Sequence, residues 1–447
     1  MFSGLFGKEK RNYAIVANNL YGAQKIYEFL LNFFPEEEIV FFPVDELLRA
    51  EAISSSRDLL SQRLYAMGQL LTPGKKILIT HPAGLLHYLP SPSFFKESIV
   101  TLKKGEKVDL EKLKFRLSRL GYKRVNKIDQ SLQYAVRGDI VDIFSVNSLS
   151  PYRIELFDDE IESIRTFDAA TQNSLKEVDF ITILPASETL LSDDEINDFA
   201  KNVAITLEEE EKHLKSQNAE MLHSNVMNDV MDIVERNDKP SLYKYFSYAS
   251  KEAHSILEYF AVDDVFITSK EDFQDSCASL INESESYFLE LQNDFRIIKG
   301  LRNYMPLSEA LPKKYPVSYG ARFLIGSSTY ELNIMPIVPS GNGISAIMPT
   351  LESYFGTSAK VVIALSEPHQ RETIANMLHE AGIEFENVNG YELPIGKIGL
   401  SDASLNVGFE VGNAKISYIS SSELFGHRAS SSRYTARFKN ATILKSY

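Results

Sequence analysis

Two neighbouring runs of sequence decide how this chain is interpreted: residues 134–144 are Tyr-Ala-Val-Arg-Gly-Asp-Ile-Val-Asp-Ile-Phe, and residues 152–168 are Tyr-Arg-Ile-Glu-Leu-Phe-Asp-Asp-Glu-Ile-Glu-Ser-Ile-Arg-Thr-Phe-Asp. In the second run the apolar Ile154 and Leu156 alternate with Arg153, Glu155 and Phe157. Successive side chains of a strand point to opposite faces. The run therefore predicts a strand with one apolar face and one charged face that also carries an aromatic ring.

The residues around this strand predict a small antiparallel sheet. Asp158 and Asp159 are turn residues, and residues 161–167 can return antiparallel, which favours a hairpin. Residues 134–144 predict another strand, broken at Arg137 and Gly138, where glycine permits a bulge or a close backbone approach.

We expect Arg137, Arg153 and Phe157 to gather on one open face of this sheet. Residue types alone leave an alternative, in which Phe157 packs beneath a neighbouring loop and the arginines are ordinary surface charges.

Composition limits the classes of function. The chain has 447 residues, 44% of them hydrophobic, and a net charge of −14. That length predicts several domains, and the negative charge disfavours broad nucleic-acid binding. The single cysteine, Cys277, excludes an internal disulfide framework and a multi-cysteine metal site, and the eight histidines lack zinc-ligand spacing. Without a long apolar run or a recognisable signal peptide, we expect a cytoplasmic protein that does not enter a membrane.

The order of apolar runs predicts an α/β chain. Strands at residues 13–17, 39–42 and 76–79 alternate with helices at 20–34 and 57–71, which indicates a parallel, doubly wound lobe. We expect a first part of this lobe at 12–98, an inserted α+β domain at 99–180, a second, mostly helical and acidic part of the lobe at 181–313, a separate small α/β domain at 314–425 and a linker tail at 426–447. Residues 303–320, rich in proline, predict a boundary or linker.

Within the insert, Asp109 can cap a helix with leucines at helical spacing, ending near Gly121. The many lysines and arginines of residues 103–127 suggest DNA contact, but interspersed acidic residues favour a solvated helix face.

Within the small α/β domain, residues 358–366 predict a buried strand, and Ser366 can cap a helix over 367–380. The alternating apolar residues of 405–411 predict a half-buried strand.

A nucleotide site is the obvious hypothesis for such a lobe, and its motif is missing. A phosphate loop needs Gly-x-x-x-x-Gly-Lys-Ser/Thr after the first strand, where residues 18–25 are Asn-Asn-Leu-Tyr-Gly-Ala-Gln-Lys. No carboxylate is paired with His, Cys or Lys at a catalytic spacing. We therefore predict no catalytic, cofactor-binding or metal-binding residues in this chain.

Residues 134–168, followed by Thr171-Gln172 and by Ile-Leu-Pro-Ala at 183–186, resemble one module. It is the module shared by the excision-repair protein UvrB and the transcription-repair coupling factor family. The resemblance extends from about Val16 to the C-terminus. Residues 42–48, Phe-Pro-Val-Asp-Glu-Leu-Leu, are similar to the first lobe of the coupling factors, whereas UvrB is expected to carry a tyrosine-rich DNA-clamping hairpin at this place.

The resemblance implies a fold and a partner. The lobe would be a degenerate RecA/UvrB-like copy without nucleotide binding, and the insert would bind UvrA. The residues carried over for UvrA binding are Arg137, Arg153 and Phe157, with Glu155, Asp159, Glu160 and Arg165 as weaker candidates.

The family pattern continues with an RNA-polymerase-binding domain and two ATP-driven translocase domains, which are absent here. We therefore expect an N-terminal fragment or a naturally short relative, monomeric, that reaches RNA polymerase and DNA only through the absent domains. The predicted function is non-catalytic recruitment of UvrA to stalled transcription complexes. Two alternatives stay open: a UvrB-like DNA-dependent ATPase or helicase, and an autoinhibitory scaffold that covers the same sheet face to restrain the missing motor.

Overall fold

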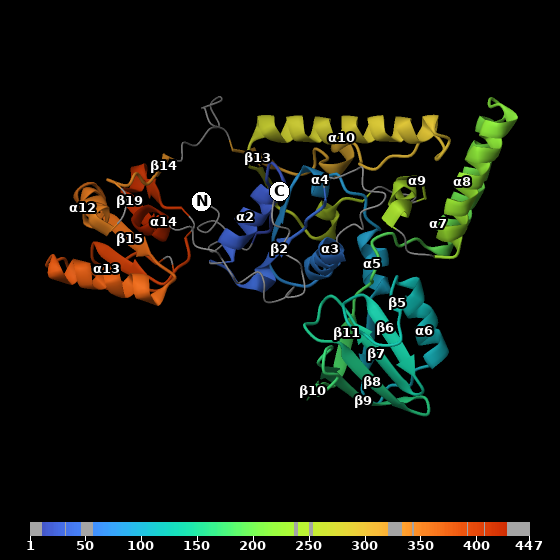
Figure 1. Ribbon diagram of the computed structural model, residues 1–447, viewed down its shortest axis with the longest axis horizontal. Coiled ribbons are helices and arrows are strands. Elements are labelled where there is room, and N and C mark those ends of the chain that lie inside the picture. The colour runs from blue at the N-terminus through green and yellow to red at the C-terminus, as the bar shows by residue number, and fades with distance from the viewer. Residues whose placement is uncertain are drawn as a thin grey trace. The chain divides into compact units, whose positions relative to one another are not determined.

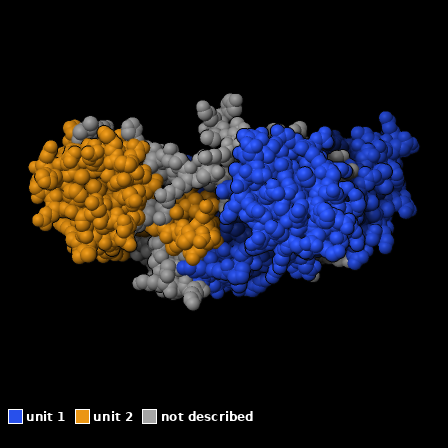
Figure 2. Space-filling model, turned by 90° about the horizontal axis from the view of Figure 1, so that it is seen from below, with its two compact units in different colours: residues 1–24, 40–320 blue, residues 25–39, 321–447 orange. Residues whose placement is uncertain are grey.

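The structure is a computed structural model that describes residues 11–31, 33–45, 57–236, 240–249, 254–320, 333–341, 344–390, 392–405 and 407–426. The chain forms two compact units, coloured separately in Figure 2: residues 1–24 with 40–320, and residues 25–39 with 321–447. The finer division into five segments stays a prediction. Of the predicted tail at 426–447, only Gly426, which follows α14, is among the described residues.

A five-stranded sheet forms the centre of the first unit (Figure 1). Its order is β13-β12-β1-β3-β2, and β1 pairs in parallel with both β3 and β12. All residues of β1 and β3 are buried, as expected for a parallel sheet covered on both faces. The strands are β1 (Tyr13–Val16), β2 (Ile39–Phe41), β3 (Ile77–Thr80), β12 (Asp264–Ile267) and β13 (Val317–Tyr319). The predicted α/β class is confirmed, and the likeness of this lobe to RecA stays a prediction.

Helices surround this sheet and extend from it. The longest are α7, α8 and α10, and α7 packs along α8 as an antiparallel pair joined by a short turn. The helices are α3 (Arg57–Leu70), α4 (Pro82–Leu85), α5 (Pro92–Ser98), α7 (Asp193–Glu211), α8 (Ser216–Val234), α9 (Phe246–Ala249), α10 (Lys270–Asn293) and α11 (Leu307–Ala310). The helix α2 (Leu20–Leu30) begins in the first unit, and its residues from 25 onward belong to the second. Among the described residues, no helix has the length and apolarity needed to cross a membrane.

The insert is a six-stranded sheet with α6 (Leu110–Arg119) alongside β5 and β6 (Figure 1). Asp109 caps α6 as predicted, accepting a hydrogen bond from the Lys112 amide at 3.0 Å. The strands follow the order β10-β9-β8-β7-β6-β5, and only β5–β6 pair in parallel. They are β5 (Lys123–Arg124), β6 (Gln133–Arg137), β7 (Ile140–Phe144), β8 (Tyr152–Phe157), β9 (Glu160–Phe167) and β10 (Ser174–Glu177). Before and after these strands in the sequence come β4 (Val100–Lys103) and β11 (Phe180–Ile183), which pair with one another as an antiparallel ribbon.

Two sequence-based expectations in this unit are wrong. Residues 134–144 are not one strand with a bulge, because Gly138, with a φ of 58°, turns the chain and lets β6 and β7 pair as a hairpin. Residues 303–320 do end at a boundary, since the first unit ends at Gly320, but they are not a linker. They contain α11 and β13, and β13 extends the central sheet because its residues pair in parallel with β12.

The second unit contains a six-stranded sheet of order β14-β18-β19-β15-β17-β16. The predicted strand at 358–366 is confirmed as β15, whose residues 361–364 are buried. The strands are β14 (Ile334–Pro336), β15 (Lys360–Ala364), β16 (Glu386–Val388), β17 (Ile398–Ser401), β18 (Phe409–Val411) and β19 (Ile416–Ser420). The helices are α12 (Ile347–Thr357), α13 (Pro368–Glu380) and α14 (Ser421–Phe425).

Two details of the second unit differ from the prediction. The residue that precedes α13 is Glu367, not Ser366, and its side chain makes no capping bond. The strand predicted at 405–411 is β18, which begins only at Phe409, and Gly408 before it passes close to other groups. A Cβ at Gly408 would lie 2.7 Å from the Tyr418 carbonyl oxygen, and its amide donates to Glu423 at 3.0 Å.

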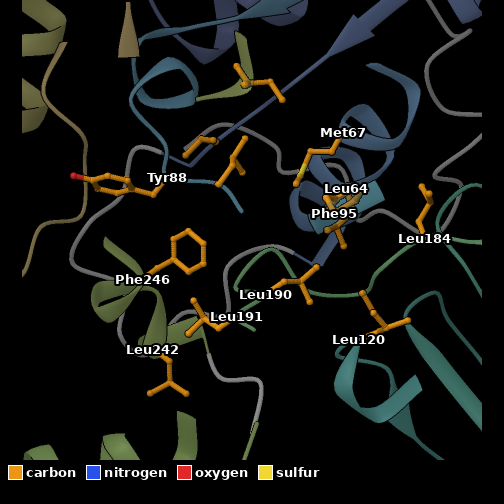
Figure 3. Packing of buried hydrophobic residues seen from close by; sticks show 14 of the residues in the cluster. Leu64, Met67, Tyr88, Phe95, Leu120, Leu184, Leu190, Leu191, Leu242 and Phe246 are labelled. Carbon is orange, nitrogen blue, oxygen red and sulfur yellow. The ribbon is translucent and has the colours of Figure 1, made fainter. Parts of the chain in front are cut away.

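A buried ion pair joins the lobe to the place where the inserted domain ends. Arg63 of α3 donates from Nε and Nη2 to the two carboxylate oxygens of Glu188, each at 2.7 Å. Its Nη1 donates to the Pro43 carbonyl at 3.3 Å. Figure 3 shows the apolar side chains around this junction, including Leu64 of the same helix and Leu184 of the segment that leaves the insert.

The electrostatics of this pair depend on its burial. Burial alone raises the pKa of Glu188, but Arg63 and His87 outweigh it and hold that pKa well below its ordinary value. A carboxyl whose folded pKa is depressed stabilises the fold above its unfolded pKa and loses that contribution as the pH falls. The stabilisation by Glu188 is therefore complete at neutral pH and decreases below about pH 4.5.

We predict that Glu188→Gln lowers the free energy of unfolding by about 3 kcal/mol at pH 7, because it leaves Arg63 buried without its counter-charge. The difference from wild type should shrink as the pH falls from 5 to 3. Urea unfolding at a series of pH values measures both effects. Glu111→Gln, which breaks the exposed pair with Lys114, is the control and should change stability little at either pH. Equal stability of Glu188→Gln and wild type at pH 7 would contradict this account.

Candidate functional site

The outer face of the inserted sheet carries most of the residues predicted for partner binding. Residues directly opposite in paired strands share a face. One row runs Asp142, Arg153, Arg165 across β7, β8 and β9, and the next row runs Arg137, Ile140, Glu155, Ser163. Ile154 and Ile164 of the opposite face are fully buried. The predicted division of β8 into an apolar and a charged face is thus confirmed.

Arg153 is tied into this face. Its Nε and Nη2 donate to the two oxygens of Asp142 at 2.8 Å each, and its guanidinium carbon lies 4.4 Å from the centre of the Phe167 ring. The hydrogen bonds to Asp142 raise the pKa of Arg153 further above its ordinary value, against the effect of partial burial. Arg153 therefore shields two buried groups, Asp142 and Phe167, besides carrying a charge.

Glu155 and Arg165 form a second pair on the same face. Arg165 Nη2 donates to Glu155 Oε2 at 2.6 Å, and the Ser163 hydroxyl donates to the same oxygen at 2.7 Å. Arg137 is exposed and donates from Nε to the Asn126 carbonyl at 3.1 Å. These contacts hold charged groups of the face in defined positions.

Phe157 is 74% exposed and ends β8 on the outer face, so the alternative in which it packs beneath a loop is wrong. Ile140, 37% exposed, lies opposite Glu155 and is therefore a diagonal neighbour of Phe157 on the same face. Sequence reasoning missed Ile140, because only the strand register brings it beside Phe157. An exposed aromatic and an exposed aliphatic side chain thus stand among ordered charges.

The remaining two predicted residues lie at the tip of the β8–β9 hairpin. Asp158, with a φ of 58°, and Asp159 form the turn, and Phe157 pairs with Glu160 across it. Asp159 is engaged by Lys107, whose Nζ lies 3.0 Å from Asp159 Oδ2. The hydrogen bond from Lys107 raises the pKa of that lysine. Glu160 therefore lies next to Phe157, whereas Asp159 is already paired with Lys107 at the tip of the hairpin.

The turn that follows β1 is held by a hydrogen bond of its own and by bonds to the segment after β12. Asn18 Oδ1 accepts a hydrogen bond from the Thr268 hydroxyl at 2.7 Å, and Asn18 Nδ2 donates to Asp272 at 2.9 Å. Asn19 Oδ1 accepts from the Gly22 amide at 2.8 Å. In nucleotide-binding sheets the first backbone amides of the helix after the first strand, here α2, face a phosphate. Here one amide is used by Asn19, and the Asp272 carboxylate repels an incoming phosphate.

A metal ion and a reactive thiol are the other sources of chemistry to weigh in this chain. Within the described residues, no group of three or more His, Cys, Asp or Glu side chains has the geometry to hold a metal ion. Cys277 is buried, and burial raises the pKa of its thiol to about 12. That thiol is therefore almost entirely protonated at neutral pH.

We predict that Arg153→Ala lowers the free energy of unfolding by about 2 kcal/mol, because it leaves the buried Asp142 carboxylate without its partner. Phe157→Ala should leave stability nearly unchanged, since the ring is mostly in solvent. Urea unfolding of both variants measures the difference. If Arg153→Ala were as stable as wild type, the Asp142–Arg153 pair would not hold this face together.

Comparison with known proteins shows which family this module resembles. Residues 100–188 match the family model of the UvrB interaction domain. The whole chain is similar to the transcription-repair-coupling factor of Bacillus subtilis (strain 168), at 25% identity and 39% of that protein's length. Similar proteins with the same name occur in Staphylococcus haemolyticus (26% identity, 98% of this chain, 38% of the relative) and Staphylococcus aureus (strain USA300; 26%, 100% and 39%). The chain thus spans about two fifths of these relatives, and the matches confirm the predicted resemblance to the N-terminal region of transcription-repair coupling factors, UvrB-related module included.

Proposed function

We propose that this chain acts in transcription-repair coupling by recruiting the excision-repair protein UvrA to stalled transcription complexes. The docking surface is the outer face of the inserted sheet, around Phe157. The observation that carries the proposal is the exposure of Phe157 and Ile140 together on a face whose charges are held by defined hydrogen bonds. The match of residues 100–188 to the UvrB interaction domain supports a protein-binding role for this module.

Phe157 is the expected anchor. A mostly exposed phenylalanine that keeps its place on a strand loses little conformational entropy when a partner buries it. Truncating an aromatic anchor at the centre of an interface typically costs about 2 kcal/mol of binding free energy or more. Ile140 enlarges the apolar centre, and Arg137, Glu155, Glu160 and Arg165 form a polar rim around it.

The rim provides register and specificity. Both signs of charge occur within two strand positions of Phe157, so a partner surface must match them in order. Glu155 and Arg165 already pair with one another. Each side chain is therefore held in a defined position before a partner bonds to it. Arg153 contributes through the framework, because its guanidinium is engaged by Asp142 and Phe167.

We also propose that the chain has no catalytic role of its own. The rival function, a UvrB-like DNA-dependent ATPase, needs a phosphate site at the carboxyl end of β1. The hydrogen bonds of Asn18 and Asn19 and the carboxylate of Asp272 disfavour phosphate there. DNA-stimulated ATP hydrolysis by the purified chain would argue for the rival function.

We predict that Phe157→Ala weakens UvrA binding about 30-fold or more, the equivalent of about 2 kcal/mol. Titration of labelled wild-type chain and variants with purified UvrA, followed by fluorescence anisotropy, gives the dissociation constants. Phe180→Ala is the matched control, because Phe180 is 62% exposed on the same domain but belongs to the β4–β11 ribbon. Its affinity for UvrA should equal that of wild type.

Ile140→Ala provides a second test of the same surface. It should weaken UvrA binding less than Phe157→Ala, because a smaller exposed area is lost. Wild-type affinity in both Phe157→Ala and Ile140→Ala would refute the assignment. Equal losses of UvrA affinity in Phe157→Ala and Phe180→Ala would show that the docking surface is not the outer face.

A further inference from the structure

A cleft of about 370 Å³ lies between the inserted domain and the lobe, away from the face that carries Phe157. Its walls come from α5, α6, the segment after β11 and Arg236, which lies just beyond α8. Phe115, Arg116 and Arg119 project into it from one side of α6, whereas Leu113 and Leu117 of the same helix are buried in the core. One helix thus covers the inserted sheet and lines the cleft.

Three guanidinium groups belong to this cleft, against the single acidic side chain of Glu97 in its lining. Arg119 and Arg236 both donate to the same oxygen of Asp193, the latter at 2.6 Å. Arg116 donates from Nη2 to two backbone carbonyls at 3.3 Å each. A guanidinium has five N–H donors, so these bonds leave donors that can reach an additional acceptor.

The bottom of the cleft is apolar. Leu190 and Leu191 line it and also line an adjoining cavity of about 50 Å³, which Arg119 and Arg236 border as well. In Figure 3, Leu190 and Leu191 lie between Leu120 of the insert and the pair Leu242 and Phe246. Phe115, 64% exposed and 5.4 Å from the Arg119 guanidinium carbon, adds an aromatic wall. Apolar space therefore lies directly beside guanidinium donors.

We propose that this cleft binds a short acidic segment of a partner protein, in which an apolar side chain is flanked by carboxylates. The apolar side chain would enter between Phe115 and Leu191. Its neighbouring carboxylates would accept hydrogen bonds from Arg116 and Arg119. Charge complementarity carries the choice of occupant, because a cationic cleft on a chain of net charge −14 is locally opposite to the rest of the protein.

Single-stranded nucleic acid is the other anionic ligand to weigh, and the cleft suits it less. Nucleic acid binding needs a groove that follows many phosphates and aromatic rings on which successive bases stack. The cleft offers three arginines, and its depth is lined by leucines. A segment with a few carboxylates also meets less repulsion from the acidic protein than a polyanion does.

Peptide selection tests the proposal and does not require the partner to be identified. A random peptide display library, panned on the wild-type chain and counter-selected on Phe115→Ser, should enrich sequences with an aromatic or leucine beside Asp or Glu. Selected peptides, labelled with fluorescein, should bind about tenfold or more weakly to Phe115→Ser and to Arg116→Glu. Both residues are exposed, so both variants should unfold in urea like wild type.

The control is Lys112→Glu, which makes the same kind of charge change on α6 at a residue outside the cleft. It should leave peptide binding at the wild-type level, as should Phe157→Ala. Failure to enrich acidic-apolar peptides would overturn the proposal, and so would equal binding to wild type and Arg116→Glu. Displacement of the peptides by a single-stranded oligonucleotide that itself binds more tightly would assign the cleft to nucleic acid instead.

Discussion

The ion pair between Arg63 and Glu188 is the constraint on which the arrangement of the first unit depends. One guanidinium bonds to Glu188 and to the Pro43 carbonyl, so three segments far apart in sequence meet at a single side chain. A buried charge without its partner is strongly destabilising. The pair therefore defines where the inserted domain rejoins the lobe. The cleft beside α6 is lined by residues of the lobe and of the insert, with leucines and arginines among them.

The two faces of the inserted sheet differ in what they contribute. Its inner face buries aliphatic side chains with α6, and this burial stabilises the domain. Its outer face exposes Phe157 and Ile140 while Asp142 and Glu155 hold the arginines beside them. Apolar groups left in solvent do not stabilise the monomer, and we therefore propose this face as the surface for a partner. In the lobe, by contrast, the polar side chain of Asn18 in the turn after β1 is bonded to Asp272 of α10.

Much of this could be predicted from one sequence. Alternation along residues 152–157 gave the face of each side chain, since the period of a strand is two residues. Asp158 and Asp159 correctly predicted the hairpin, and Asp109 correctly predicted the start of α6. The break at Gly138 was located correctly but misjudged, because glycine suits a turn as well as a bulge. The strand β13 was missed because its three residues are too short for a periodic signal.

The sequence by itself determined the α/β class, the alternation that exposes Phe157, and the absence of a phosphate-loop motif after β1, because each is encoded in adjacent residues. Only the tertiary structure decided that Arg153 is engaged by Asp142 and Phe167, that Ile140 joins Phe157, and that Arg116 and Arg119 face a cleft. These relations depend on strand register and on the packing of α6, which no single stretch of sequence specifies. The contacts of each arginine are therefore set by its neighbours in space rather than by its neighbours in the chain.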